Sequence, residues 1–578
     1  MSSPTPYSDR LALLFVAASV SLPFLQPIHS PPITSFYSEW LAVAFGLLAL
    51  FSVTLGGAPR IPRLALWPLA FVVLIALQGV QGTVANGGMA TLACIYLIWA
   101  ACMMSCSATL AARTSADTVA SAIATGLVVG ATISALIALA SLTGINGIWL
   151  ARQAGAMSAG NLAQKNHLAQ LLWLGIASLG YLHWRRGLPS GPALALLLLL
   201  ATVSLLTGAR ATLLYAAWCS LLLWGWGQRR QGVGLIVVYT IALVVLPKLI
   251  TLDPGGDAAS RIATAAANLG GNPQLIDARW QVLGEAWRMF LDAPLGGVGF
   301  GGFSWHAFVD QINANAQFAS GENAHNLFAQ IAAEFGLPGL ILLAGGLLVA
   351  LRFLGGVWRE SPYRWVVACL GIQLIHSQLE YPLWYAYFLG VFSLLLGLLP
   401  QHEYALRLPR WVWAGALLAG GFVAFDIGRD HVMLESAVNA MPRTEAQFRA
   451  RNQILTVMSR YSLLGVYADS TLVASAPPIS AALAEKRTLC RKTLTAQPSA
   501  PGIFHCALFE ELAGCHHTSE QLWALGGRSF PAQRDYVADA LRQNLRAEDL
   551  QPLLPRLSAD AAPPAAPDQR ADCRFPGL

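Results

Sequence analysis

Long apolar segments constrain this chain more than any other feature, because they recur from the N-terminal region to about residue 428. Each run is close to the roughly 20 residues that a helix needs to cross a bilayer. We count about thirteen such runs, of which the pair around residues 191–227 is the least regular. Hydrophobic residues make up 55% of the chain and charged residues 11%, against roughly 25% charged in soluble domains. The sequence therefore predicts an all-α polytopic membrane protein and excludes a soluble fold.

Basic residues are divided unequally between the two sides of the predicted bundle. Counting from the N-terminus, alternate connections collect most of the arginines, whereas the short connections on the other side hold only Arg152, Lys165 and Arg210. Because the richer side is normally cytoplasmic, the segment 252–337, the turn at Tyr381 and the polar tail are expected to face outward.

The chain divides into four predicted parts. These are helices one to nine over 1–251, an outer loop over 252–337, helices ten to thirteen over 338–428, and an outer C-terminal domain over 429–578. The last part has no apolar run and indicates short helices around 445–459, 479–494 and 531–545, with a disordered end near 561–567. No internal repeat or inverted pair of broken helices suggests a transporter.

Four of the nine cysteines lie in the polar tail, at positions 490, 506, 515 and 573. An even number in an outward-facing domain favours two disulfides, with three possible pairings. The alternative is a zinc site that uses Cys506 and Cys515 together with nearby histidines, although their spacing fits no standard zinc motif.

The stretch around His325 is the most polar part of the predicted outer loop. Asn323 is a good N-cap for a helix over 324–335, and Gly336 is suited to end it. His325 would then lie in the first turn, where the helix dipole favours anions and a neutral imidazole. Glu334 would lie in the last turn, where a carboxylate calls for a cationic partner.

Two further outer positions carry cations and amides. Gln164 and Lys165 precede a predicted span that Asn166 is suited to cap, and Arg210 lies in a tight turn between two spans. Arginine presents a planar fork that matches phosphate oxygens. These side chains suit a phosphate site. Lys165 has an alternative role, because a lysine before a span can also extend its side chain along the membrane surface.

A third outer turn contains His376, Glu380 and Tyr381. The first two are four residues apart and share a helix face. They form either half of a metal site or, as we prefer, a hydrogen-bonded pair that positions the tyrosine.

Together these patches suit an anionic lipid headgroup, such as a pyrophosphate-linked sugar. The outer segment contains a glycine-rich stretch, 296–302, and the aromatic residues Phe303, Trp305 and Phe308, which are expected to cover the site and stack on sugars. No strand precedes the glycines, so we do not expect a nucleotide site, and nothing indicates nucleic acid.

Three motifs resemble a known family. His325-Asn326 followed by Glu334, Gly336 and Gly339 resembles the signature of the O-antigen ligase and polymerase superfamily. The stretches 164–169 and 376–384 are similar to motifs of one branch, the bacterial protein O-oligosaccharyltransferases or pilin glycosylases. The resemblance covers about residues 145–400.

The resemblance implies a glycosyltransferase of the GT-C type that works at the periplasmic face of a bacterial inner membrane. Its donor would be an undecaprenyl-pyrophosphate oligosaccharide, and its acceptor a serine or threonine hydroxyl on a periplasmic protein such as type IV pilin. No cofactor or metal would be required.

By motif, the resemblance implies that His325, Gln164 and Tyr381 are catalytic and that Arg210 binds phosphate. We add Lys165 to the phosphate site, and we expect the following supporting residues: Asn326, Glu322, Glu334, His376 and Glu380. His325 would act as a base, in which case the rate rises through about pH 6–7, or as a cation for pyrophosphate, in which case it falls.

Other functions compete with this interpretation. Within the superfamily, the chain could be a ligase that acts on lipid A core or a polymerase that joins repeat units. A flippase for lipid-linked oligosaccharides is the alternative from another class, but its charges would lie near the bilayer midplane.

Overall fold

The computed structural model describes residues 6–142, 157–237, 239–240, 273–310, 323–401, 403–404, 408–544, 546–557, 568, 570–575 and 578. These residues are almost entirely helical. The longer helices of the first part are α1 (Tyr7–Ser19), α2 (Phe36–Gly56), α3 (Leu66–Gln81), α4 (Gly87–Arg113), α5 (Ala116–Leu142), α6 (Lys165–Arg186), α7 (Ser190–Leu206) and α8 (Ala211–Gly225). They are followed by α11 (Pro273–Asp292), α12 (Phe303–Asp310), α13 (Leu327–Leu354), α14 (Tyr363–His376), α15 (Ala386–Gly397) and α16 (Arg410–Asn439). The only strands among the described residues, β1 (Ile61–Pro62) and β2 (Glu403–Tyr404), form one short antiparallel pair.

Several helices have the length and composition of membrane spans. Among the described residues, six are long and apolar enough to cross a bilayer: Phe36–Gly56, Arg63–Gln81, Gly87–Arg113, Ala116–Ser141, Leu327–Leu354 and Arg410–Asn439. Three shorter apolar helices accompany them, namely α7, α8 and α15. The chain is therefore an all-helical, multi-pass membrane protein.

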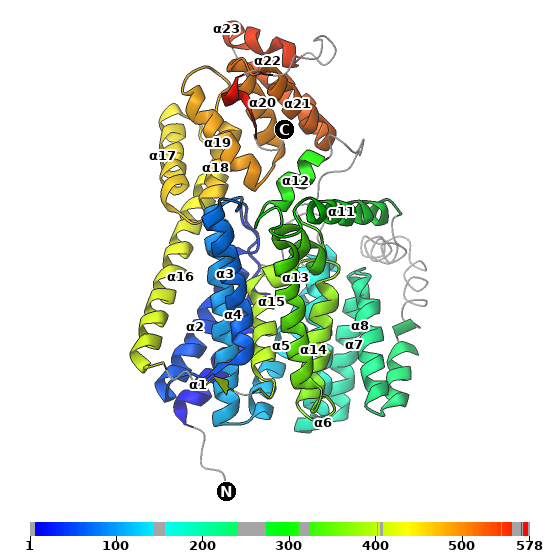
Figure 1. Ribbon diagram of the computed structural model, residues 1–578. Coiled ribbons are helices and arrows are strands. Elements are labelled where there is room, and N and C mark those ends of the chain that lie inside the picture. Colours follow the sequence, from blue (N-terminus) through cyan, green and yellow to red (C-terminus); the bar gives the residue numbers. More distant parts are fainter. Residues whose placement is uncertain are drawn as a thin grey trace.

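The apolar helices stand side by side in one bundle (Figure 1). Its core contains fully buried side chains from distant helices, such as Leu110, Trp173 and Phe388. Small residues allow close helix contacts: a Cβ added at Gly397 would lie 2.3 Å from the carbonyl oxygen of Met104. Such close approaches stabilise helix packing where lipid offers no hydrophobic driving force between helices.

Helix α11 does not follow the direction of the bundle but lies across one end of it (Figure 1). Glu285, Ala286 and Met289 are buried, whereas Trp280 and Trp287 are 70% and 57% exposed. α11 packs against α13, so it is held next to the segment that contains His325.

Helix α16 continues from the bundle into the C-terminal part of the chain (Figure 1). There it leads to α17 (Glu445–Tyr461), α18 (Gly465–Ser475), α19 (Leu483–Ala496), α20 (Ala500–Leu512), α21 (His516–Ser529), α22 (Pro531–Asn544), α23 (Ala547–Leu550) and α24 (Leu554–Leu557). Three of these correspond to the helices predicted in this region. Thr444 and Gln447 form a capping box that starts α17. The predicted disordered end, 561–567, lies outside the described residues.

The C-terminal helices, α17–α24, bury apolar side chains in clusters besides the core of the bundle, and two disulfides fasten them. Cys490 is bonded to Cys506, and Cys515 to Cys573. The zinc alternative for Cys506 and Cys515 is therefore wrong, because both sulfurs are used in disulfides.

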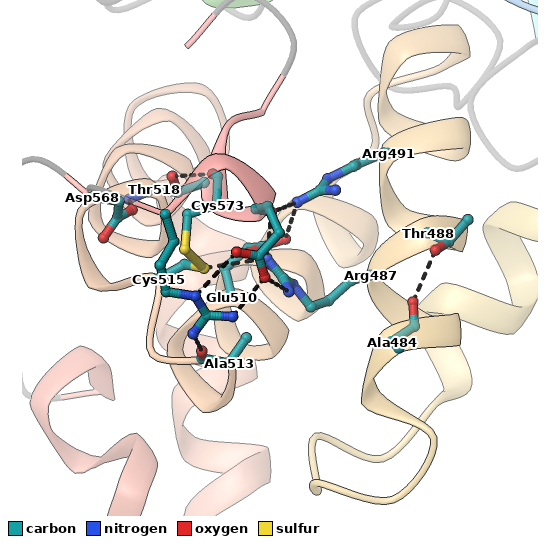
Figure 2. A network of polar contacts seen from close by, with 12 residues as sticks. Ala484, Arg487, Thr488, Arg491, Glu510, Ala513, Cys515, Thr518, Asp568 and Cys573 are labelled. Atoms are coloured by element: carbon teal, nitrogen blue, oxygen red, sulfur yellow. Dashed lines mark hydrogen bonds and ion pairs between the residues drawn. A yellow bond between two sulfur atoms is a disulfide. The ribbon is translucent and has the colours of Figure 1, made fainter.

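A network of charges surrounds the second disulfide (Figure 2). The buried carboxylate of Glu510 accepts a 2.7 Å hydrogen bond from Arg487, and Arg487 also donates to the backbone oxygen of Asp572. Arg570 binds the carboxylate of Asp572 at 2.6 Å. Hydrogen bonds from Arg570 and Arg487 lower the pKa of Asp572 to about 2. The segment around Cys573 is thus held to the C-terminal helices by covalent and ionic contacts.

The aromatic residues expected to stack on sugars are buried instead. Phe303, Trp305 and Phe308 are all less than 5% exposed. Trp305 and Phe308 belong to the core of the C-terminal helices, where Phe575 lies 5.6 Å from Trp305 between ring centroids. Their role is to attach α12 to that core, so the sugar-stacking expectation was wrong.

Candidate active site

The helix that follows His325, α13, begins later in the chain than the sequence indicates. Asn326, and not Asn323, is the N-cap of α13, and its side-chain oxygen accepts a 3.0 Å hydrogen bond from the N–H of Ala329. The Asn323 side chain accepts from the N–H of His325 at 3.0 Å. His325 therefore lies before the helix and not in its first turn.

His325 has a backbone conformation that non-glycine residues seldom adopt, with φ of 47°. The neighbouring residues hold this turn in place, since the N–H of Leu327 donates to the carbonyl of Ser377 at 2.7 Å. A strained residue that its surroundings fix in this way is typical of functional sites.

Glu380 connects three parts of the chain at this point. One carboxylate oxygen lies 2.9 Å from Nδ1 of His325, and the other accepts a 2.8 Å hydrogen bond from the amide of Asn166 at the start of α6. The guanidinium of Arg279 on α11 is 3.8 Å from Glu380. The carboxylate therefore has partners on α6, on α11 and in the segment before α13.

This environment keeps Glu380 ionised and orients the imidazole. Burial alone would raise the pKa of Glu380, but the hydrogen bond and charge of His325, with His376 and Arg279, hold that pKa below its usual value. Because an ionised carboxylate only accepts hydrogen bonds, Nδ1 of His325 carries the proton. Nε2 of the neutral ring is then free to accept a proton.

The expected side-chain hydrogen bond between His376 and Glu380 is not formed. His376 is fully buried, and its Nδ1 lies 2.6 Å from the hydroxyl of Tyr215 on α8. Glu380 meets His376 only through a backbone bond, from its N–H to the carbonyl of His376 at 2.9 Å. The turn directs the carboxylate of Glu380 toward His325 instead. The sequence did not indicate this contact between Glu380 and His325.

Tyr381 contributes to an aromatic wall beside the histidine. Its ring is 5.7 Å from the ring of His325 in an edge-on arrangement, and it stacks on Tyr385 at 5.6 Å. Tyr381 is therefore adjacent to the imidazole, as expected for a residue that orients a substrate.

Glu334 was expected to have a cationic partner, but no described residue forms an ion pair with it. Its carboxylate accepts a 3.0 Å hydrogen bond from the N–H of Gly301, and its backbone oxygen accepts from Gln78 at 2.8 Å. The glycine-rich stretch, 296–302, thus packs against the broken turn of α13 at Gly336, where φ is 61°. Gly336 interrupts the helix as predicted, but helical structure resumes after it and continues to Leu354.

A cavity of about 230 Å³ brings these side chains together. Among the predicted site residues, it is lined by His325, Asn326, Glu334, Glu380 and Tyr381. Phe300 and Trp384 add aromatic surface to it. The cavity thus combines a proton acceptor, fixed carboxylates and aromatic rings, which suits recognition of a sugar.

Four other predicted residues do not line this cavity: Gln164, Lys165, Arg210 and His376. Glu322 lies outside the described residues. Helix α6 begins after Gln164, so Asn166 is not its cap and uses its amide on Glu380 instead. Lys165 and Arg210 are half-buried and form no ion pair with another residue of the described ranges.

Comparisons with known proteins address the identity of this site. Residues 195–344 match a family model described as O-antigen ligase, and residues 364–543 match one described as virulence factor membrane-bound polymerase, C-terminal. The chain is 26% identical over 429 residues to the general O-oligosaccharyltransferase of Acinetobacter baylyi, covering 67% of this chain and 70% of that protein. Together these matches support an assignment of the chain to the O-oligosaccharyltransferase and O-antigen ligase superfamily. It is an enzyme of the glycosyltransferase type.

The two matched segments meet at the cavity. The first contains Arg279, His325 and Glu334, and the second contains Glu380 and Tyr381. The histidine and its carboxylate partner therefore come from different matched segments.

Two residues of the ligase-superfamily site were missed by the sequence analysis. Asn166 lies inside a recognised motif but was assigned to capping, and Arg279 was not singled out at all. The available signal for Arg279 was its position beside Trp280 on an amphipathic segment, where a cation next to an aromatic residue suggests an interface.

Proposed function

We propose that this enzyme transfers an oligosaccharide from an undecaprenyl-pyrophosphate carrier to a serine or threonine hydroxyl of a periplasmic protein, such as type IV pilin. The reaction would take place at the periplasmic face of the bacterial inner membrane. The observation that carries the proposal is the His325–Glu380 pair in a sugar-sized cavity. The similar Acinetobacter protein is a general O-oligosaccharyltransferase, which supports transfer of an oligosaccharide to a hydroxyl oxygen.

In the proposed reaction, Nε2 of His325 takes the proton of the acceptor hydroxyl while that oxygen attacks the anomeric carbon of the donor sugar. The bond from this carbon to the pyrophosphate oxygen breaks, and its electron pair leaves with the pyrophosphate. Glu380 stabilises the imidazolium that forms, and Tyr381 orients the substrates.

We assign Lys165 and Arg210 to the departing pyrophosphate. They lie outside the cavity, so the lipid-linked phosphates would extend from it toward the starts of α6 and α8. Contacts connect these helix starts to the site, since Asn166 binds Glu380 and Tyr215 of α8 binds His376. Two cations without carboxylate partners among the described residues are suited to an anion. Gln164 would orient the donor, because its side-chain oxygen is buried and has no hydrogen-bond partner among the described residues.

The remaining expectations belong to the same proposal. We propose about thirteen spans in a GT-C-type arrangement, with residues 252–337 and 429–578 in the periplasm. We also propose that no metal is required, because arginine and lysine supply positive charge for the leaving group. Transfer that continues undiminished in excess EDTA would support this, and a requirement for added Mg²⁺ or Mn²⁺ would contradict it.

The decisive experiment measures glycan transfer to pilin in cells that supply the lipid-linked donor. Pilin should gain mass with the wild-type enzyme and not with His325→Ala. His183→Ala is the matched control, because this histidine lies near the opposite end of α6 from the site and should be dispensable.

Two results would revise the proposal. Glycan on lipid A core instead of pilin would make the enzyme a ligase. Full pilin modification by His325→Ala would remove the histidine from the mechanism.

A further inference from the structure

The cavity around His325 has a side that does not belong to the membrane bundle. Tyr467, Ala496 and Gln497 of the C-terminal helices line it together with His325 and Tyr381. The proposed mechanism assigns no role to these residues. They face the reacting groups across a single cavity, so they are candidates for contact with a substrate.

Tyr467 is placed by packing between the C-terminal helices and the bundle. It lies on α18, where the buried N-cap residue Leu464 and Ala468 pack with Leu434 of α16. α18 also touches α4, and a Cβ added at Gly88 of α4 would lie 2.8 Å from the carbonyl oxygen of Leu463. The tyrosine therefore has a fixed position at the cavity.

Gln497 is placed by the end of α19. Its N–H donates to the carbonyl of Thr493 at 2.8 Å, and its own backbone is extended, which ends the helix at the cavity. Ser499 then caps α20 by accepting a hydrogen bond from Gly502. The half-buried amide of Gln497 is thus presented by a short, well-defined connection.

Aromatic contacts fix this part of the C-terminal domain relative to the bundle. Trp305 and Phe308 of α12 lie in the C-terminal core, where Phe308 is 6.3 Å from the ring of Phe530. α12 also packs against α19, which ends at Gln497. The two sides of the cavity are therefore held together by buried apolar surface.

The position of these residues favours one of the two substrates. A lipid-linked donor has its hydrocarbon chain in the membrane, so it enters from the side of the spans and of the proposed phosphate residues. A polypeptide enters from the aqueous side, which the C-terminal helices form. A glutamine amide both donates and accepts hydrogen bonds, as a peptide group requires, and a tyrosine ring packs on an extended chain.

We propose that Tyr467 and Gln497 bind the acceptor polypeptide and position its hydroxyl next to His325. This inference rests on the proposed function and deepens it, because it assigns acceptor recognition to the C-terminal domain. The two residues are positioning residues and take no part in proton transfer.

The test is steady-state transfer by the purified full-length enzyme to a pilin-derived peptide, with donor and acceptor varied separately. Tyr467→Ala and Gln497→Ala should each raise the KM for the peptide by at least about five-fold, a loss equivalent to roughly 1 kcal/mol, while the KM for the donor stays unchanged. Tyr467→Phe should retain most of the affinity, because the ring remains.

Matched controls exist in the same domain. Tyr461 is 83% exposed at the end of α17, and Gln533 is exposed on α22; neither lines the cavity. Tyr461→Ala and Gln533→Ala should leave both KM values unchanged. If Tyr467→Ala does not fold, Gln497→Ala decides the question alone, because its side chain lies at a helix end and only half-buried.

Two outcomes overturn the inference. Peptide KM values equal to those of the controls would show that these residues do not bind the acceptor. A rise in donor KM instead would assign them to the glycan. A wild-type enzyme that modifies no peptide at all would contradict the proposed function itself, which is a separate result.

Discussion

Glu380 lies between Asn166 and His325, and its carboxylate accepts a hydrogen bond from each of them. Glu380→Gln preserves the shape of the side chain but removes the charge that stabilises the imidazolium. We expect kcat to fall by roughly 10²-fold, within the range of general acid–base effects, with little change in donor KM. Transfer assays with Glu360→Gln, an exposed glutamate after α13, provide the control.

The pH dependence of the reaction separates the two roles considered for His325. Because the pKa of Glu380 is held below its usual value, this carboxylate stays ionised across the neutral range. A base mechanism needs the neutral imidazole, so it gives a rate that rises with pH across the neutral range. A falling profile over the same range would instead assign His325 to pyrophosphate binding as a cation.

Glu285 provides a test of stability at the residue scale. Burial raises the pKa of Glu285 on α11 to about 7, an effect that Arg288 opposes and Asp310 adds to. The unfolded chain therefore releases this proton at lower pH than the folded protein, so the free energy of unfolding decreases as pH rises from about 4.5 to about 7. Above that range the loss is complete and constant.

Glu285→Gln should consequently raise the melting temperature at pH 8 by several degrees and leave it nearly unchanged near pH 4.5. Glu548→Gln, on an exposed side chain of α23, should change neither value. An equal shift at both pH values would show that packing, and not ionisation, causes the effect.

Among the elements, the glycine-rich stretch and the broken turn of α13 make a close backbone contact near the site. Gly297 has φ of +68°, and a Cβ there would lie 2.2 Å from the carbonyl carbon of Glu334. Gly297→Ala should therefore cost at least about 1–3 kcal/mol and reduce activity, because the turn that carries Glu334 must move. Gly296→Ala, where an added Cβ meets nothing within 4 Å, should be tolerated. Thermal melting and transfer rates check both.

The helices also show what the sequence predicts well and where it stops. Apolar length identified the six described helices that are long enough to cross a membrane, because a bilayer imposes a minimum length on every crossing helix. One of the thirteen predicted runs, at 382–399, forms only the 12-residue helix α15. Apolar length did not indicate this, because it does not show that Pro382–Trp384 form a separate turn before the helix.

The sequence indicated several residues that line the cavity, but it did not indicate most of the contacts between them. Asn323 and Asn326 are equally good caps by type, and the choice between them depends on the bond from Leu327 to Ser377, which is not local. Likewise, the partners of Glu380 come from α6, α11 and the segment before α13, and no local spacing records such contacts. His325 and Tyr381 were found because their motifs are contiguous.

At the scale of the whole molecule, the second disulfide, Cys515–Cys573, connects the chain near residue 573 to the C-terminal helices. It closes a separation of 58 residues, so removing it should lower the free energy of unfolding of this region by about 2–4 kcal/mol. We predict that the double substitution C515S/C573S increases proteolysis of the C-terminal helices and raises the KM for the acceptor peptide.

The free cysteine Cys94 offers a control, since Cys94→Ser breaks no disulfide. Limited proteolysis followed by mass spectrometry locates the loosened region. Cleavage that begins in the membrane bundle, with the C-terminal helices intact, would contradict the prediction.

The contact between Trp305 and Phe575 has a consequence for the order in which the protein matures. Trp305 leaves the ribosome long before Phe575, so α12 must wait for much later residues before its aromatic side chains are covered. Until then, the apolar core that holds α12 against α19, the helix that ends at Gln497, is incomplete. A nascent enzyme with its histidine already in place would thus lack a binding surface for the protein it modifies, and activity would begin only as biosynthesis of the C-terminal region is completed.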